Sequence, residues 1–117
     1  MIKLQEIKEI LETYRKYGWT LQKILLSDRL KNELSAAEIK LFSSGVKVSN
    51  SKADGALFSR SSKNNKEAWE LRHLHLNPFA IFELIDAEIS NSEKEKILKQ
   101  MENRLEDYAS NDLSRNH

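Results

Sequence analysis

The sequence contains no cysteine, which excludes disulfide bridges, thiolate nucleophiles and cysteine-ligated zinc or iron–sulfur centres. It has one proline and three glycines among 117 residues, too few for a long disordered tract. The glycines, Gly18, Gly45 and Gly55, are far apart, so the sequence has neither a phosphate-binding loop nor a dinucleotide-binding fingerprint. No nucleophile motif is present either, and we therefore expect the protein not to be an enzyme.

The chain also lacks a long apolar run and an excess of charge of one sign. Its first residues, MIKLQEIKEILETYRKYG, carry charges throughout, so we expect no signal peptide, no membrane helix and a cytoplasmic location. The 19 basic and 18 acidic residues are interleaved and leave a net charge of +1. A nucleic-acid-binding domain usually has a clear basic excess, so we do not expect nucleic acid as a partner.

The length fits one domain, which we place at residues 1–109, followed by a flexible C-terminal tail over residues 110–117. Helical periodicity predicts helices over residues 2–17 and 92–109, with short helical pieces over 28–44. The first helix has apolar residues at spacings of three and four: Leu4, Ile7, Leu11 and Tyr14. Two pairs have the spacing of a helix-capping box: Ser35 with Glu38, and Ser92 with Glu95.

The strands are expected mainly in the second half of the chain. Residues 56–61, 67–74 and 79–85 indicate an antiparallel meander. Residues 19–27 fit a fourth strand, although a helical stripe fits them too. Residues 46–55 are expected to form a loop that could include a short edge strand at Val46 and Val48. The predicted fold is α+β: a three- to four-stranded antiparallel meander sheet covered on one face by the N- and C-terminal helices.

The two faces of this sheet follow from an assumed pairing of Leu74 with Phe79, because side chains alternate along a strand. One face then carries Trp69, Leu71, Ala80, Phe82 and Leu84, and we expect the helices to cover it. Truncation of Phe82 to alanine is expected to cost about 3–5 kcal/mol if this residue lies in the core. A slip of one residue in the pairing would exchange the faces.

The opposite face carries the residues that we expect to bind a partner or ligand: Phe58, Arg60, Glu70, Arg72, Leu74, Phe79, Ile81 and Glu83. The favoured interpretation of the charged half is cross-strand ion pairing, with arginines between Glu70 and an opposing Glu83. There are two alternatives: the arginines form a recognition site for a carboxylate or phosphate, or the charges form a buried network inside a dimer. The apolar half would be an unusual patch to leave in water, which indicates a partner.

Other potential sites in the sequence have simpler interpretations. His73 and His75 form an H-x-H pair, but a zinc site needs at least one more nearby ligand, so we expect neither a metal nor a cofactor. Trp19 and Trp69 are expected to belong to the core rather than to stack on a ligand.

These patterns predict a non-catalytic protein-interaction module: an adaptor, a small chaperone-like domain or a self-associating domain. Its partner would be another protein or a second copy of the chain, bound on the free face of the sheet. The alternative is a small-molecule binder or enzyme for an anionic ligand, using a cluster of Arg60, Glu70, Arg72 and Glu83.

Overall fold

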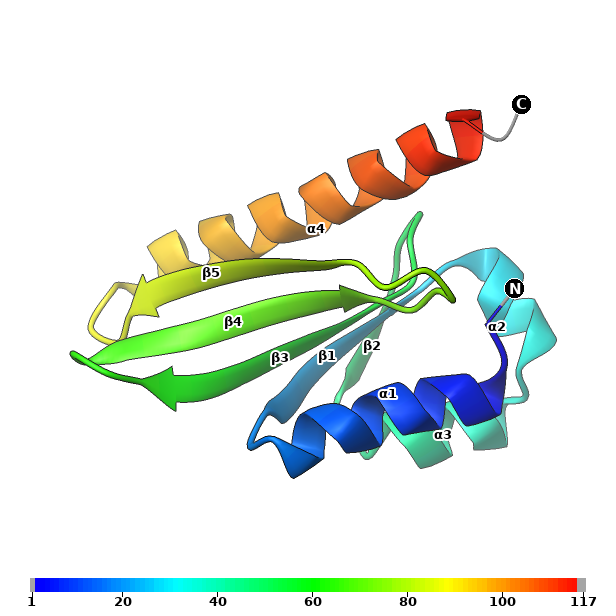
Figure 1. Cartoon of the computed structure of the whole chain (residues 1–117), viewed down its shortest axis with the longest axis horizontal. Coiled ribbons are helices and arrows are strands. Elements are labelled where there is room, and N and C mark those ends of the chain that lie inside the picture. Colours follow the sequence, from blue (N-terminus) through cyan, green and yellow to red (C-terminus); the bar gives the residue numbers. More distant parts are fainter. Residues whose placement is uncertain (1, 116–117) are drawn as a thin grey trace.

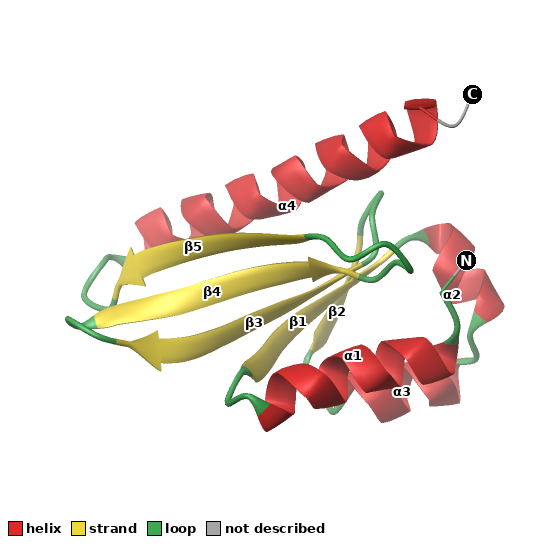
Figure 2. Ribbon diagram, viewed as in Figure 1, coloured by secondary structure: helices red, strands yellow, loops and turns green. Residues whose placement is uncertain are grey.

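The computed structural model describes residues 2–115, with side chains through residue 111. In chain order these residues form α1 (Leu4–Lys16), β1 (Thr20–Leu26), α2 (Asp28–Glu33), α3 (Ala36–Ser43), β2 (Lys47–Asn50), β3 (Gly55–Ser62), β4 (Lys66–His73), β5 (Ala80–Asp86) and α4 (Asn91–Arg115). Figures 1 and 2 show this arrangement. The predicted helices and the meander are confirmed, and residues 19–27 form a strand rather than a helix.

The sheet is mixed and, within the described residues, has five strands in the order β2-β1-β3-β4-β5. The prediction of a purely antiparallel sheet of three to four strands is wrong in this respect. Helices α2 and α3 carry the chain back after β1, so that β2 pairs parallel to β1. The remaining neighbours, β1–β3, β3–β4 and β4–β5, are antiparallel.

The terminal helices pack on opposite faces of the sheet, and the prediction that both cover one face is wrong. We call these faces the α1 face and the α4 face. On the α1 face, Tyr14 of α1 stacks on Phe58 of β3, with ring centroids 4.1 Å apart. On the α4 face, Met101 and Leu105 of α4 pack in one buried cluster with Leu71 of β4. Because the sheet is apolar on both faces, each face needs its own helical cover.

Local signals in the sequence explain where the helices begin and end. Ser35 and Glu38 form the predicted capping box at the start of α3, with reciprocal hydrogen bonds of 3.0 and 2.8 Å. At the start of α4, the hydroxyl oxygen of Ser90 accepts from the Glu93 amide at 3.2 Å, so the cap lies two residues before the predicted Ser92. The helix then continues beyond residue 109, and residues 116–117 of the predicted flexible tail lie outside the described residues.

The register between β4 and β5 differs by one residue from the expected one. His73, not Leu74, is opposite Phe79, and its amide donates to the Phe79 carbonyl at 2.8 Å. Leu74 instead turns into the core on the α1 face, and its amide donates to the Asp54 carbonyl at 2.9 Å. The slip places Ala80, Phe82 and Leu84 on the α1 face and leaves Ile81 and Ile85 on the α4 face.

Candidate functional site: an open sheet surface

Half of the α1 face has no helix over it. In Figures 1 and 2, no helix passes in front of β4 and β5, while α1 and α3 lie beside β1. The side chains of this region, which we call the open sheet surface, are the exposed Arg60, Ala80, Phe82 and Leu84 and, at its border with α1, the half-buried Glu70 and Arg72. Phe82 is 50% exposed and Leu84 53% exposed, which is high for large apolar residues in the middle of a strand. This surface is therefore the main candidate for binding.

The boundary of the open sheet surface is set by Tyr14 of α1. Its ring covers Phe58, and its hydroxyl donates a hydrogen bond to the carboxylate of Glu70 on β4. Burial, followed by the hydrogen bond to Glu70 and the charge of that residue, raises the pKa of Tyr14 well above its usual range. The hydroxyl therefore remains protonated and holds α1 at β4, one strand short of Phe82 and Leu84.

The two arginines of the open sheet surface are both held by the rest of the chain. Arg60 donates to the Tyr17 carbonyl at 2.7 Å, and its guanidinium lies 5.6 Å from the ring centroid of Trp19. Arg72 donates to the carbonyl of His73. Arg60 therefore stabilises the connection that follows α1, and Arg72 stabilises the end of β4. Both arginines border the apolar residues of β5.

The structure separates the eight residues predicted to form one site. Arg60, Glu70 and Arg72 lie on the open sheet surface, and Phe58 and Leu74 lie on the same side of the sheet but are buried in its core. The other three belong to the α4 face: Phe79 stacks on Tyr108, Ile81 is buried, and Glu83 accepts from Arg104 at 3.1 Å. Glu70 is opposite Phe82, so its predicted pairing with Glu83 is wrong. A binding role for these residues stays a prediction.

Sequence reasoning missed Phe82 and Leu84, which it placed in the core. Strand β5 is apolar at both parities, with Ile81 and Ile85 at odd positions and Ala80, Phe82 and Leu84 at even positions. The hydrophobic pattern therefore does not fix which set faces a helix. Both sets contain strand-forming residues, so no signal within β5 itself identifies the packed set.

The backbone of β5 adds a second property to the same residues. Hydrogen bonds from His73 to Phe79 (2.8 Å) and from Ala87 to Asn65 (2.9 Å) fix the phase of the β4–β5 ladder at both ends. In an antiparallel ladder every second residue directs its N–H and C=O groups to the neighbouring strand. The odd residues of β5 therefore bond to β4, and the N–H and C=O groups of Ala80, Phe82 and Leu84 point away from β4. Strand β5 is at the sheet edge, so within the described residues no neighbouring strand pairs with these groups.

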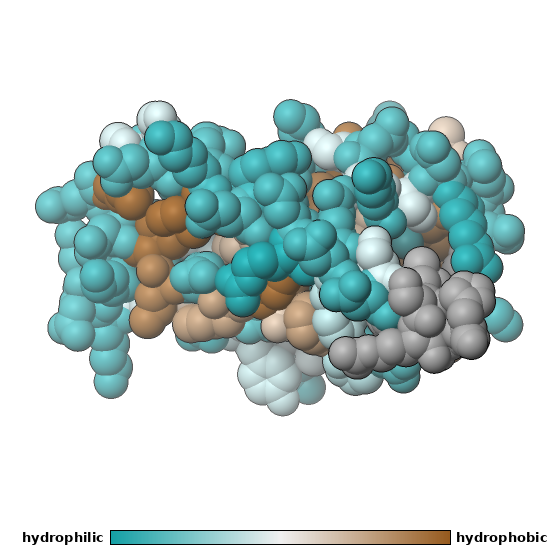
Figure 3. Space-filling view, turned by 90° about the horizontal axis from the view of Figure 1, so that it is seen from above, coloured by the Kyte–Doolittle hydropathy of each residue, from teal (hydrophilic) through white to brown (hydrophobic). Residues whose placement is uncertain are grey.

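The surface seen from the side of α4 has a different character. Figure 3 shows mainly hydrophilic side chains there, with hydrophobic ones gathered toward the end where β5 leads into α4. Lys94 of α4 covers the Trp69 ring at 4.8 Å and pairs with Glu67 at 3.1 Å, which shields this part of the core. Trp69 is buried, as predicted, and Trp19 packs half-buried against the core of the α1 face.

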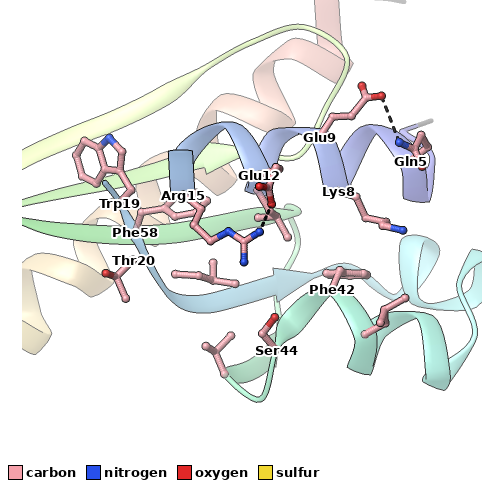
Figure 4. Close-up of a pocket in the computed structure, with 14 residues that line it drawn as sticks. Gln5, Lys8, Glu9, Glu12, Arg15, Trp19, Thr20, Phe42, Ser44 and Phe58 are labelled. Carbon is pink, nitrogen blue, oxygen red and sulfur yellow. Dashed lines mark hydrogen bonds and ion pairs between the residues drawn. The ribbon is translucent and has the colours of Figure 1, made fainter. Parts of the chain in front are cut away.

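A groove of about 730 Å³ lies between α1 and α3 (Figure 4). Its floor is apolar and includes Leu11, Leu21, Phe42 and Phe58. Its rim carries charges of both signs, and Arg15 pairs with Glu12 across one turn of α1. These opposed charges give no preference for an anionic or cationic ligand, so the groove is a weaker candidate than the open sheet surface.

The histidine pair does not gather the ligands of a metal site. His73 and His75 stack on each other with centroids 5.1 Å apart, and the described residues contain no cluster of three or more metal-binding side chains. Nearby Asp54 accepts from the amide and hydroxyl of Ser27 at 2.6 and 3.2 Å. Burial raises the pKa of Asp54, although the Ser27 hydrogen bonds act in the opposite direction.

Two further findings concern the chain as a whole. In the part of the chain that the structure describes, none of the helices has the length and apolar character needed to cross a membrane. Comparisons with protein-family models, with curated proteins and with solved structures found no match.

Proposed function

We propose that this protein is a non-catalytic protein-interaction module that binds a polypeptide strand at the edge of β5. One observation carries the proposal: the residues with exposed apolar side chains, Phe82 and Leu84, are also those whose backbone groups point away from the sheet. A strand added at this edge would use both properties together. Its backbone would bind the free N–H and C=O groups, and its side chains would cover Phe82 and Leu84.

The energetics of this surface favour an interaction over exposure to water. Each square ångström of apolar surface removed from water contributes roughly 25 cal/mol, and both large side chains are half exposed. A long apolar edge strand without a partner is also prone to unspecific pairing. Glu70 and Arg72 lie beside the apolar residues on β4 and supply the polar border that is typical of interfaces.

The alternative, an anionic ligand bound by a cluster of four charges, has less support. Glu83 lies on the α4 face with Arg104, away from the other three residues. Arg60 and Arg72 already donate to backbone carbonyls, and Glu70 already accepts from Tyr14. An anion would therefore have to compete with these internal contacts.

The proposal is tested by capture from an extract of the native cells, with three forms of the protein. The test variant combines Phe82→Ser with Leu84→Ser; the control is Leu41→Ser, a residue of α3 that is 64% exposed elsewhere on the molecule. We expect wild type and control to retain the same polypeptides and the test variant to lose them, with unchanged circular dichroism spectra. Equal retention by all three would refute the proposal.

A further inference from the structure

We infer that the strand bound at the edge of β5 is the β5 strand of a second copy of this chain, paired antiparallel about a two-fold axis at Phe82. This inference rests on the proposed function and names its partner. The product is a symmetric dimer in which the two sheets join into one continuous sheet, and the two open sheet surfaces become one.

The free backbone groups of β5 are arranged symmetrically about Phe82. Before Ala80, the preceding residue whose backbone would point away from β4 is Pro78, which has no N–H to donate. The next such residue after Leu84 is Asp86, whose carbonyl already accepts from the Ile89 amide at 3.2 Å. The free ladder therefore consists of Ala80, Phe82 and Leu84, with Phe82 at its centre. Two such ladders match when they run antiparallel, as a two-fold axis requires.

The side chains fit the same pairing. On the open sheet surface, Phe82 would lie beside Phe82 of the second copy, and Leu84 would lie beside the small Ala80. Two phenylalanine rings would thus meet at the axis, and a leucine would meet an alanine at each end. No charged residue of β5 would be opposite a like charge. Shifting the axis to Glu83 would place two glutamates directly opposite each other, which is unfavourable.

The other edge of the sheet is a poorer site for pairing. Strand β2 has only four residues, Lys47–Asn50, and begins with an exposed lysine. A short strand and an edge lysine are both features that prevent pairing between sheets. The seven-residue β5 has its charged residues, Glu83 and Asp86, already bound to Arg104 and Lys66. Self-association by strand pairing is therefore expected at β5 alone.

The first experiment is sedimentation of the purified full chain over a range of concentrations. We expect a reversible monomer–dimer equilibrium whose dissociation constant rises about tenfold or more in Leu84→Lys, which corresponds to about 1.4 kcal/mol or more. Leu41→Lys places the same charge on an exposed leucine of α3 and is expected to leave the equilibrium unchanged. A monomer at every concentration, or a dimer unaffected by Leu84→Lys, would overturn the inference.

The second experiment determines the position of the axis, and it is possible because the chain has no cysteine of its own. Under mild oxidation we expect Phe82→Cys to form a disulfide dimer, because two residues that form a hydrogen-bonded antiparallel pair have Cα atoms about 5.5 Å apart. Glu83→Cys and Leu84→Cys are expected to stay monomeric on a denaturing gel, since their Cα atoms would be more than about 7 Å apart. Cross-linking of Glu83→Cys or Leu84→Cys instead would overturn the proposed axis.

The two proposals fail in different ways. A monomeric protein that still loses captured polypeptides when Phe82 and Leu84 are replaced by serine would refute the dimer and support the interaction module. A dimer that is insensitive to Leu84→Lys, together with capture that is insensitive to the serine variant, would refute both.

Discussion

Neighbouring residues of β5 have opposite environments. Ile81 is 3% exposed in the core between the sheet and α4, whereas Phe82, the next residue, is half exposed on the open sheet surface. The larger side chain therefore contributes less to the stability of a single copy. The same position is available to a partner, and we propose that its contribution is to binding.

This contrast gives a matched pair of variants. Ile81→Ala is expected to lower the free energy of unfolding by about 2–5 kcal/mol, the usual effect of truncating a buried aliphatic side chain. Phe82→Ala is expected to lower it much less, because its side chain is already half in water. Urea unfolding at low protein concentration, where monomers dominate, measures both. Equal losses would mean that the face assignment of β5 is inverted.

Asp54 gives a prediction for pH dependence. Burial raises its pKa in the folded state, so the folded protein binds this proton more tightly than the unfolded chain. The stability from Asp54 is therefore present below the ordinary carboxyl pKa of about 4 and is lost as pH rises through the raised pKa. Relative to Asp54→Asn, the free energy of unfolding of the wild type should fall over this interval. A relative gain with rising pH, measured by urea unfolding, would show the opposite sign.

At the scale of elements, the position of α4 depends on close contact with β3. A Cβ atom added to Gly55 would lie 2.8 Å from the Leu105 side chain, so the absence of a side chain at Gly55 lets α4 approach the sheet. Lys23 of β1 and Glu102 of α4 add a partly buried ion pair of 2.9 Å on the same face. These two contacts tie α4 to β3 and β1, in addition to its packing against β4 and β5.

Truncation of Leu105 tests this packing. Leu105→Ala is expected to cost about 2–5 kcal/mol, because the side chain is fully buried and the cavity cannot be filled by a rigid sheet. Asp107→Ala lies two residues further along α4 on its exposed side and is expected to change stability by less than about 0.5 kcal/mol. Thermal unfolding of both variants gives the comparison, and similar melting temperatures would contradict the assigned packing.

The elements themselves could be predicted from the sequence, but their assembly could not. Helical periodicity identified α1, strand-like runs separated by turn residues identified the meander, and Ser35 with Glu38 marked the start of α3. The sheet was predicted too narrow because residues 46–55 are rich in turn-forming residues and were expected to form a loop, with a short edge strand at Val46 and Val48 only as an option; Lys47–Asn50 form β2. The split of the terminal helices between two faces was missed because it depends on both faces of the sheet being apolar, which is a tertiary property.

For the site, three of the eight predicted residues lie on the open sheet surface: Arg60, Glu70 and Arg72. The apolar part was assigned to the wrong residues because the assumed pairing of Leu74 with Phe79 is off by one: His73 is opposite Phe79, and the Leu74 amide extends the ladder with β3 by donating to the Asp54 carbonyl. This contact joins residues 20 positions apart in the chain, and no local sequence pattern predicts it. The register, and with it the exposed set, is therefore decided by tertiary structure.

At the scale of the whole molecule, two helical covers of unequal extent leave one exposed region. Helix α4 crosses the α4 face against β3, β4 and β5, whereas α1 covers the α1 face only as far as β4. The uncovered region lies next to the longer free edge of the sheet. Both faces of the sheet are thus covered by helices at β1 and β3, whereas β5 is covered on the α4 face alone. This is the strand at which we propose that a second polypeptide binds.

The placement of β1 has a consequence for the order in which the chain assembles. Strands β3, β4 and β5 and helix α4 follow one another along the chain, so their contacts close only short loops. Strand β1 can join β3 only after residues 27–54 have looped out, a slower step with a larger entropic cost. We expect the meander to gain amide protection first during refolding and β1 with β2 to gain it last, as pulse-labelled hydrogen exchange can show. A refolding chain would accordingly present an unpaired β3 edge until β1 joins it.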